Sequence, residues 1–302
     1  MWFWMSLVAL ICWSGSDLFS KIGCRDADDK YSHLKMVIAV GAVMGLHALY
    51  SIFVGGTEIN LNIVLTYLPV SALYILSMAI GYLGLRYIEL SISSPICNSS
   101  GAIVAVLCIM TGGIAGTNPM QLVATALVCI GVVGLGIAEA TEDDELRRAR
   151  QEQSNYKYAK SLIAILIPVI YCLLDALGTF ADSIVLEKLN EDSANAAYEL
   201  TFLFVGIVSF IYVVVIRKDR LIPKREIPKY AGAAFETAGQ FAYIYAIADS
   251  RHVAMSAPII SAYCVLSVLW SRIFLKEKLT VKHYAAIAVT VVGIVILGFF
   301  DV

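Results

Sequence analysis

Ser93-Ser94-Pro95-Ile96 and Ser256-Ala257-Pro258-Ile259 each open an apolar stretch, and this matched pair indicates that the chain consists of two related halves. Other positions repeat in the same order and at a nearly constant offset. They are, in the first and second half respectively, Trp13 with Tyr171, Asp17 with Asp175, Gly131 with Gly293, and Gly136 with Gly298. Because order and offset agree together, the matches predict an internal duplication.

The composition indicates whether the fold is surrounded by water or by lipid. Hydrophobic residues are 59% of the 302 residues, charged residues only 15%, and the mean hydropathy is +0.78, which no ordinary soluble domain accommodates. A bilayer core requires about 20 apolar residues per helix. Because these stretches are too long and too uniformly apolar for barrel strands, the sequence predicts an all-α integral membrane protein. Its ten transmembrane helices are expected at about 3–22, 35–54, 66–86, 90–112, 119–139, 160–184, 197–216, 228–248, 253–274 and 281–300.

The basic residues predict the orientation in the membrane. Of the 22 lysines and arginines, only Lys188 and Arg251 fall in the connections that follow even-numbered helices. Cytoplasmic loops carry the excess of Lys and Arg. The connections after odd-numbered helices are therefore expected in the cytoplasm, with both termini outside a multi-pass protein of the cell membrane.

Five helices per copy is an odd number, so the second copy enters the membrane upside down. We expect a first five-helix repeat at 1–139, a charged cytoplasmic linker at 140–159, and a second, inverted five-helix repeat at 160–302. Inverted repeats are the architecture that many secondary transporters use for alternating access, with the substrate site between the repeats.

A family resemblance lies at the end of the ninth predicted helix. The stretch Ile273-Phe274-Leu275-Lys276-Glu277-Lys278-Leu279-Thr280 resembles a signature of the drug/metabolite transporter superfamily, in its EamA-like branch. The chain keeps Leu275, Glu277, Leu279 and Thr280 but has Lys276 where the family has glycine. The resemblance implies a ten-helix secondary transporter of a small metabolite, amino acid or drug.

Five acidic residues fall inside predicted spans: Asp17, Asp175, Asp182, Glu199 and Glu236. Each costs roughly 2.5 kcal/mol or more at a helix centre unless it is paired or hydrated. No lysine or arginine lies equally deep, so the interior is expected to favour cations or protons. Glu236 lies near the middle of its helix, with Gln240 and Tyr243 one and two turns further on the same face. It is the leading candidate for substrate binding or proton coupling, and a structural, hydrogen-bonded glutamate is the alternative.

The matched aspartates are candidate gating residues. Their helices run in opposite directions, so Asp17 is expected nearer the cytoplasm and Asp175 nearer the outside, with Trp13 and Tyr171 one turn before them as occluding aromatics. Alternatively, Asp17 pairs with Lys21, four residues further on. Asp182, towards the end of its helix, is expected at a water-filled mouth and not deep inside the span. The same two alternatives apply to Glu199 at the start of the next helix.

Aromatic and polar residues complete the candidate site. Tyrosines beside an acid suit an ammonium group through cation–π contact, although Tyr and Trp are also common at membrane interfaces. Small polar residues near the prolines can donate hydrogen bonds to a cavity or let helices pack closely. The additional candidates for substrate binding are Tyr74, Tyr82, Tyr245, Tyr263 and Asn98.

The motif search predicts neither enzyme nor cofactor. The sequence lacks a G-x-S-x-G elbow, a phosphate-binding loop and a metal-binding histidine pair, and its seven cysteines lack metal-ligand spacing. We therefore expect no catalytic, metal or cofactor site and no nucleic-acid partner. The expected function is secondary active, proton-coupled transport of a cationic or amine-bearing metabolite, such as a choline-like compound, by a monomer among membrane lipids. Export of neutral amino acids or hydrophobic metabolites is one alternative. A flippase for a lipid or lipid-linked sugar is another, and a channel is a third.

Overall fold

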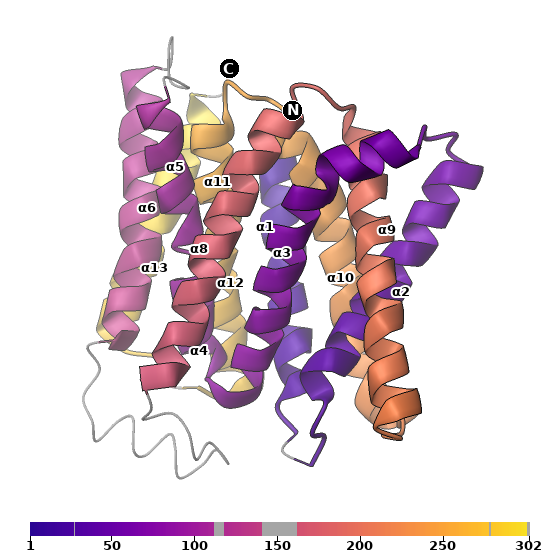
Figure 1. Cartoon of the computed structure of the whole chain (residues 1–302). Coiled ribbons are helices and arrows are strands. Elements are labelled where there is room, and N and C mark those ends of the chain that lie inside the picture. Colours follow the sequence, from indigo (N-terminus) through magenta and orange to yellow (C-terminus); the bar gives the residue numbers. More distant parts are fainter. Residues whose placement is uncertain (27, 112–117, 141–161, 278, 301–302) are drawn as a thin grey trace.

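The computed structural model describes residues 1–26, 28–111, 118–140, 162–277 and 279–300, and within these ranges all regular structure is helical (Figure 1). The elements are α1 (Trp2–Cys24), α2 (Ser32–Phe53), α3 (Leu61–Tyr87), α4 (Leu90–Cys97), α5 (Ser100–Met110), α6 (Pro119–Ala140), α8 (Leu162–Val185), α9 (Glu191–Phe210), the π-helical η1 (Ile211–Ile216), α10 (Pro223–Ile247), α11 (Val253–Ser261), α12 (Tyr263–Trp270), the π-helical η2 (Ser271–Leu275) and α13 (Val281–Phe299).

The described residues confirm ten helical spans. Nine are long and apolar enough to cross a membrane by length and composition. The tenth is α10, which carries charged residues in its first two turns and Glu236 in its middle, so its apolar character is weaker. Most of the predicted boundaries agree within about three residues, and α3, α9 and α10 begin about five residues earlier than predicted. Apart from Ala140 at the end of α6, the predicted linker lies outside the described residues.

Two of the spans are broken in the middle, which the sequence analysis did not predict. The span expected at 90–112 consists of α4 and α5, separated at Asn98 and Ser99. The span expected at 253–274 consists of α11 and α12, separated at Ala262. Pro95 and Pro258 precede these breaks by a few residues, and proline removes a helical hydrogen bond. Broken helices at membrane depth are tolerated where they are buried in protein or line a cavity.

The packing of the helices is consistent with a twofold relation between the two halves. α1 packs along α10, and the pair at the corresponding positions, α8 and α3, also pack together. Three further contacts join a span to its own counterpart: α2 to α9, α5 to α11 and α6 to α13. Two related halves that pack face to face produce such contacts between corresponding helices.

Matched glycines allow one of these contacts to be close. A Cβ built on Gly131 of α6 would lie 2.8 Å from the main-chain nitrogen of Thr290 in α13. A Cβ built on Gly293 of α13 would lie 2.8 Å from the main-chain oxygen of Ala124 in α6. Because backbone atoms cannot move aside as a side-chain end can, both positions require glycine at this helix spacing.

Both chain termini lie at the same end of the bundle in Figure 1, as an even number of crossings requires. At the other end, Lys276 and Glu277 of the stretch that resembles the family signature follow η2. Lys276 has φ 60 and ψ 26, the left-handed conformation that glycine adopts most easily. The main-chain nitrogen of Ser91, at the start of α4, donates to Glu277 Oε2 at 3.1 Å. Glu277 therefore links the end of the second broken span to the beginning of the first.

Candidate functional site

A cavity lies in the middle of the bundle and is bounded by helices from both halves. Its volume is about 70 Å³, enough for several water molecules. The broken spans contribute to its wall on both sides of their breaks. The predicted residues that line it are Trp13, Asp17, Tyr74, Tyr82, Asn98, Tyr171, Asp175, Glu236, Gln240, Tyr243 and Tyr263.

The cavity is acidic. Three carboxyl groups line it, from Asp17 in α1, Asp175 in α8 and Glu236 in α10. No lysine, arginine or histidine is among the described residues that line it. Because they line one cavity, the three carboxyls form one group. Such a group requires protons or a bound cation to be stable inside a membrane.

Glu236 is held in the cavity wall from the opposite half of the chain. Its side-chain Oε2 accepts a hydrogen bond from the hydroxyl of Ser16 in α1 at 2.7 Å, and the residue is 9% exposed. Gln240 and Tyr243 follow on the same face of α10 and line the same cavity. One carboxylate oxygen therefore has a fixed donor, which orients the group without neutralising it.

Asp17 and Asp175 join the two halves through the broken spans. Asp17 Oδ2 accepts hydrogen bonds from Ser94 of α4 at 2.5 Å and from Ser267 of α12 at 2.8 Å. Asp175 Oδ2 accepts from Ser100 of α5 at 2.7 Å. Although the helix directions predict different depths, both aspartates line the same cavity. Each ties a helix of one half to a broken span of the other.

Lys21, the alternative partner expected for Asp17, has a different structural role. Its Nζ donates to the main-chain oxygens of Leu85 at 2.7 Å and Ile88 at 2.5 Å. These carbonyls lie at the C-terminal end of α3, where a positive charge is favourable. The hydrogen bonds of the Asp17 carboxylate with Ser94 and Ser267 leave its charge in the cavity.

The two matched aromatics each rest on a glycine of the other half. A Cβ on Gly239 of α10 would lie 2.3 Å from Trp13 Cδ1, and a Cβ on Gly81 of α3 would lie 2.9 Å from Tyr171 Cδ2. Any larger residue at these glycines would displace the rings. The rings of Tyr243 and Tyr263 lie 5.1 Å and 5.8 Å from that of Trp13, so the aromatics form one connected wall.

Of the polar groups in the cavity wall that have no hydrogen-bond partner, two belong to residues that the sequence predicts for substrate binding. They are the hydroxyl of Tyr82 and Nε2 of Gln240, both buried. Buried polar groups in folded proteins are nearly always satisfied, by protein or by water. Because these two line the cavity, they are available to a molecule inside it.

Three sequence-based expectations change with the structure. Tyr245 does not line the cavity; its hydroxyl hydrogen-bonds to Asp192 at the start of α9. Asp182, expected at a wet mouth, is 0% exposed and accepts a hydrogen bond from Tyr67 at 2.7 Å. Glu199 is buried against His47 of α2 at 2.8 Å and Asn195 at 3.1 Å, away from the cavity.

The sequence analysis missed cavity residues on α1 and α9. Ser16 and Ser20 line the cavity with Trp13 and Asp17. These four residues follow the spacing i, i+3, i+4, i+7, which defines one helix face, so the sequence contained the signal. Tyr198 of α9 also lines the cavity, and no sequence pattern marks it because the packing of α9 on α2 and α3 decides which face turns inward.

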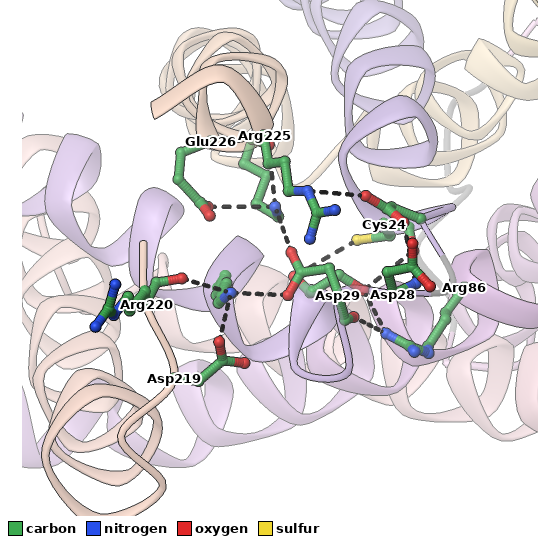
Figure 2. Close-up of polar contacts among 12 residues, drawn as sticks. Cys24, Asp28, Asp29, Arg86, Asp219, Arg220, Arg225 and Glu226 are labelled. Atoms are coloured by element: carbon green, nitrogen blue, oxygen red, sulfur yellow. Dashed lines mark hydrogen bonds and ion pairs between the residues drawn. The ribbon is translucent and has the colours of Figure 1, made fainter. Parts of the chain in front are cut away.

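A second polar site lies at the end of the bundle opposite the termini, and Figure 2 shows it. Asp29, in the loop between α1 and α2, is 2% exposed. Its carboxylate accepts from Lys35 at 2.8 Å and from Lys229 at 3.1 Å, and its main-chain oxygen accepts from Arg86. Lys35 belongs to α2, Arg86 to α3 and Lys229 to α10, so one carboxylate holds both halves together.

Two further acids complete this ionic cluster, which we define as Asp29, Lys35, Arg86, Asp219, Glu226 and Lys229. Lys229 lies 3.2 Å from Glu226, and Lys35 lies 3.5 Å from Asp219. Burial raises the pKa of Asp29, but the hydrogen bonds and charges of Lys35 and Lys229 outweigh it and hold the pKa below its ordinary value of 3.8. The Asp29 carboxylate therefore stays charged at neutral pH, and its bonds to Lys35 and Lys229 join the two halves at this end.

Comparisons with known proteins agree with this architecture. Residues 162–299 match the model of the EamA-like transporter family. A solved structure, described only as the crystal structure of a protein, superimposes with a TM-score of 0.64 over 98% of this chain and 96% of that chain. The two sequences are 12% identical, so this likeness shows the fold alone. No curated protein matches the chain.

Proposed function

We propose that this chain is a secondary active transporter of a small cationic or amine-bearing metabolite, because its residues 162–299 match the model of the EamA-like transporter family. Choline-like compounds are the first candidates. The observation that carries the proposal is the cavity itself, with three carboxyl groups, an aromatic wall and no basic residue among its described lining. Aromatic faces and carboxylates together bind ammonium groups in preference to neutral or anionic ones.

The unpartnered groups of the cavity refine the expected substrate. Nε2 of Gln240 is a donor, and the hydroxyl of Tyr82 is a donor or acceptor. A substrate that carries a hydroxyl or carbonyl oxygen near its ammonium group would satisfy them while Glu236 takes the positive charge. A purely hydrophobic amine would leave them unsatisfied at a cost of about 1–3 kcal/mol per group.

Proton coupling follows from the chemistry of a buried carboxylate. A membrane-embedded carboxylate is costly unless a cation or a proton neutralises it. If Glu236 binds the substrate ammonium in one conformation and a proton in the other, the transporter exchanges one for the other. No ATP-binding loop is present in the sequence, so an ion or substrate gradient supplies the energy.

Alternating access requires a barrier on each side of the cavity. We propose that the two five-helix repeats move against each other and that the ionic cluster closes one end, because it joins residues of both halves. The charge distribution favours this end as the cytoplasmic one, with both termini outside the cell. Since one chain supplies the whole wall of the cavity, we expect a monomer to be functional.

A ligand screen tests the proposed substrate class. We expect choline and small hydroxyl-bearing amines to raise the midpoint of thermal unfolding of the purified protein in a concentration-dependent manner. A ligand at 100 times its dissociation constant contributes about 2.7 kcal/mol to the native state. Neutral amino acids are the matched controls, since they carry an anionic carboxylate that the acidic cavity would repel.

The outcomes of this screen separate the alternatives. Stabilisation by neutral amino acids but not by amines would replace the proposal with amino-acid export. Stabilisation by lipids or lipid-linked sugars alone would favour a flippase. Uptake of radiolabelled choline into proteoliposomes then distinguishes binding from transport.

Neutralising Asp17 and Asp175 separately is expected to change the access of a labelling reagent to the cavity from opposite faces of the membrane. The native Cys97 lines the cavity and serves as reporter after the other six cysteines are replaced by serine. Asp17→Asn weakens the tie to α12, and Asp175→Asn weakens the tie to α5. Because a charge-assisted hydrogen bond contributes about 1.5–3 kcal/mol, we expect the labelling rate to change about tenfold or more.

The measurement uses a membrane-impermeant maleimide applied from one face of right-side-out or inside-out vesicles. Asp17→Asn should change labelling of Cys97 from the cytoplasmic face, and Asp175→Asn should change it from the outer face. Equal changes from the same face in both variants would contradict the assignment of the two aspartates to separate gates.

A further inference from the structure

Asp182 is a buried carboxyl group that the cavity does not use. It is 0% exposed, lies one turn before the end of α8, and is not among the residues that line the cavity. Seven residues separate it from Asp175, which corresponds to about 10 Å along the helix. Asp182 therefore lies between the cavity and the end of the bundle that is opposite the ionic cluster.

Hydroxyl groups, and no cation, surround this carboxyl. Oδ1 accepts a hydrogen bond from Tyr67 at 2.7 Å. The hydroxyl of Tyr243 also acts on the carboxyl, and Tyr74 and Tyr198 interact with it electrostatically. These tyrosines belong to α3, α9 and α10, and α3 and α10 pack against α8. Among the described residues, no lysine, arginine or histidine contributes to the electrostatics of Asp182.

The second oxygen of the carboxyl is unpartnered. Oδ2 is buried, and no hydrogen-bond donor lies within bonding distance of it. A permanent ion pair would have left a basic group beside it, and a purely structural carboxyl is usually bonded through both oxygens. A carboxyl in this position can change its charge only by taking up or releasing a proton.

A line of hydroxyls lies between the neighbourhood of this carboxyl and the cavity. The hydroxyls of Tyr74 and Tyr243 are hydrogen-bonded to each other, and the hydroxyl of Tyr74 donates to Oγ1 of Thr179 at 2.9 Å. Tyr74, Tyr243 and Thr179 all line the cavity. Thr179 lies between Asp175 and Asp182 on the same face of α8, at spacings of four and three.

We propose that Asp182 is a second proton-binding site, separate from Glu236, that exchanges protons with the substrate cavity through the hydroxyls of Tyr243 and Tyr74. In the inward step, the carboxylic acid gives its proton to the Tyr243 oxygen as the Tyr243 proton moves to Tyr74. The Tyr74 proton moves to Thr179, and the Thr179 proton leaves to cavity water. The net result is one proton in the cavity and one carboxylate at Asp182. Its role in coupling rests on the proposed function.

Infrared spectroscopy tests the proton site without any substrate. We expect pH titration of the full-length protein in nanodiscs to contain a carboxylic acid C=O band that Asp182→Asn removes and Glu236→Gln leaves in place. Tyr67→Phe, which removes the donor to Oδ1, should move the midpoint of this band. Tyr50→Phe is the matched control, since Tyr50 is exposed on α2, and should not move it.

A fallback variant and two contrary results complete this test of the proton site. If Asp182→Asn does not fold, Asp182→Glu keeps the carboxyl and should displace the band instead of removing it. An unchanged spectrum in the Asp182 variants would overturn the proposal, and so would a titration that sodium ions abolish, because a cation would then occupy the site.

Transport measurements test the coupling role separately. In proteoliposomes, Asp182→Asn is expected to retain choline–choline exchange and to lose accumulation driven by a pH gradient, which for one proton per substrate is about tenfold per pH unit. Retained gradient-driven accumulation would refute the coupling role. If the wild type transports no choline but the Asp182 band titrates, the proposed substrate is wrong while the proton site stands.

Discussion

Glu236→Gln is expected to abolish concentrative transport of choline-like amines in proteoliposomes. The substitution keeps the size and the hydrogen-bonding capacity of the side chain, and the Ser16 hydroxyl can still donate to its oxygen. It removes the charge to which we assign both substrate binding and proton exchange. Hydrogen bonds to charged groups contribute about 1.5–3 kcal/mol, so amine affinity should fall about 10- to 150-fold. Uptake against a gradient should vanish, because no proton can be exchanged at this position.

Glu199→Gln is the matched control for this experiment. Glu199 is also a buried glutamate of the second half, but it pairs with His47 outside the cavity. Its neutralisation should leave amine binding unchanged in a thermal-shift titration. Wild-type uptake by the Glu236 variant, or equal losses in both variants, would contradict the role of Glu236 in binding and coupling.

Asp29→Asn is expected to cause a large loss of stability. The change leaves the buried ammonium groups of Lys35 and Lys229 without the carboxylate that they share. Breaking a buried ion pair on one side costs about 3–5 kcal/mol when the remaining charge is uncompensated. We expect the loss to lie at the lower end of this range, because Glu226 and Asp219 still lie 3.2 Å from Lys229 and 3.5 Å from Lys35. Thermal unfolding of the purified protein, followed by circular dichroism, measures the effect. Asp26→Asn is the control, because its pair with Arg225 is about one-third exposed on both sides and should contribute only about 0–1 kcal/mol.

Acid should weaken the same cluster. The pKa of Asp29 in the folded protein lies below its ordinary value of 3.8. A carboxyl with a depressed pKa contributes stability above its unfolded pKa and loses that contribution as the pH falls through the folded value. The stability of the wild type should therefore fall more steeply below about pH 4 than that of the Asp29 variant. Parallel pH profiles would show that Asp29 is not the acid-sensitive group.

The sequence located the spans with little error, but not their breaks. Long apolar stretches determine where a helix crosses, because lipid offers the backbone no other partner. The interruptions at Asn98-Ser99 and Ala262 are only one or two residues long, and each span as a whole is apolar enough to cross a membrane. Proline marks their neighbourhood, yet Pro69 and Pro168 lie within continuous helices α3 and α8, so proline alone does not predict a break.

The sequence also predicted part of the candidate site. Charged and aromatic residues in lipid-spanning segments are conspicuous, and most of those selected line one cavity. Tyr245 and Asp182 show the limit of this approach. Tyr245 is the repeat counterpart of Tyr82, but its hydroxyl reaches Asp192 at the start of α9. Asp182 shares a helix face with Asp175, but the tyrosines of α3, α9 and α10 bury it.

The sequence by itself determined the solvent, the number of spans and the acidic interior, because each follows from the cost of placing a residue type in lipid. Only the tertiary structure decided which side chains meet. It brought Asp29 between Lys35 and Lys229, Ser16 to Glu236, and a ring of tyrosines around Asp182. These partners are far apart in the chain, and their contact depends on how helices of the two halves pack against each other, a geometry that no local pattern of residues encodes.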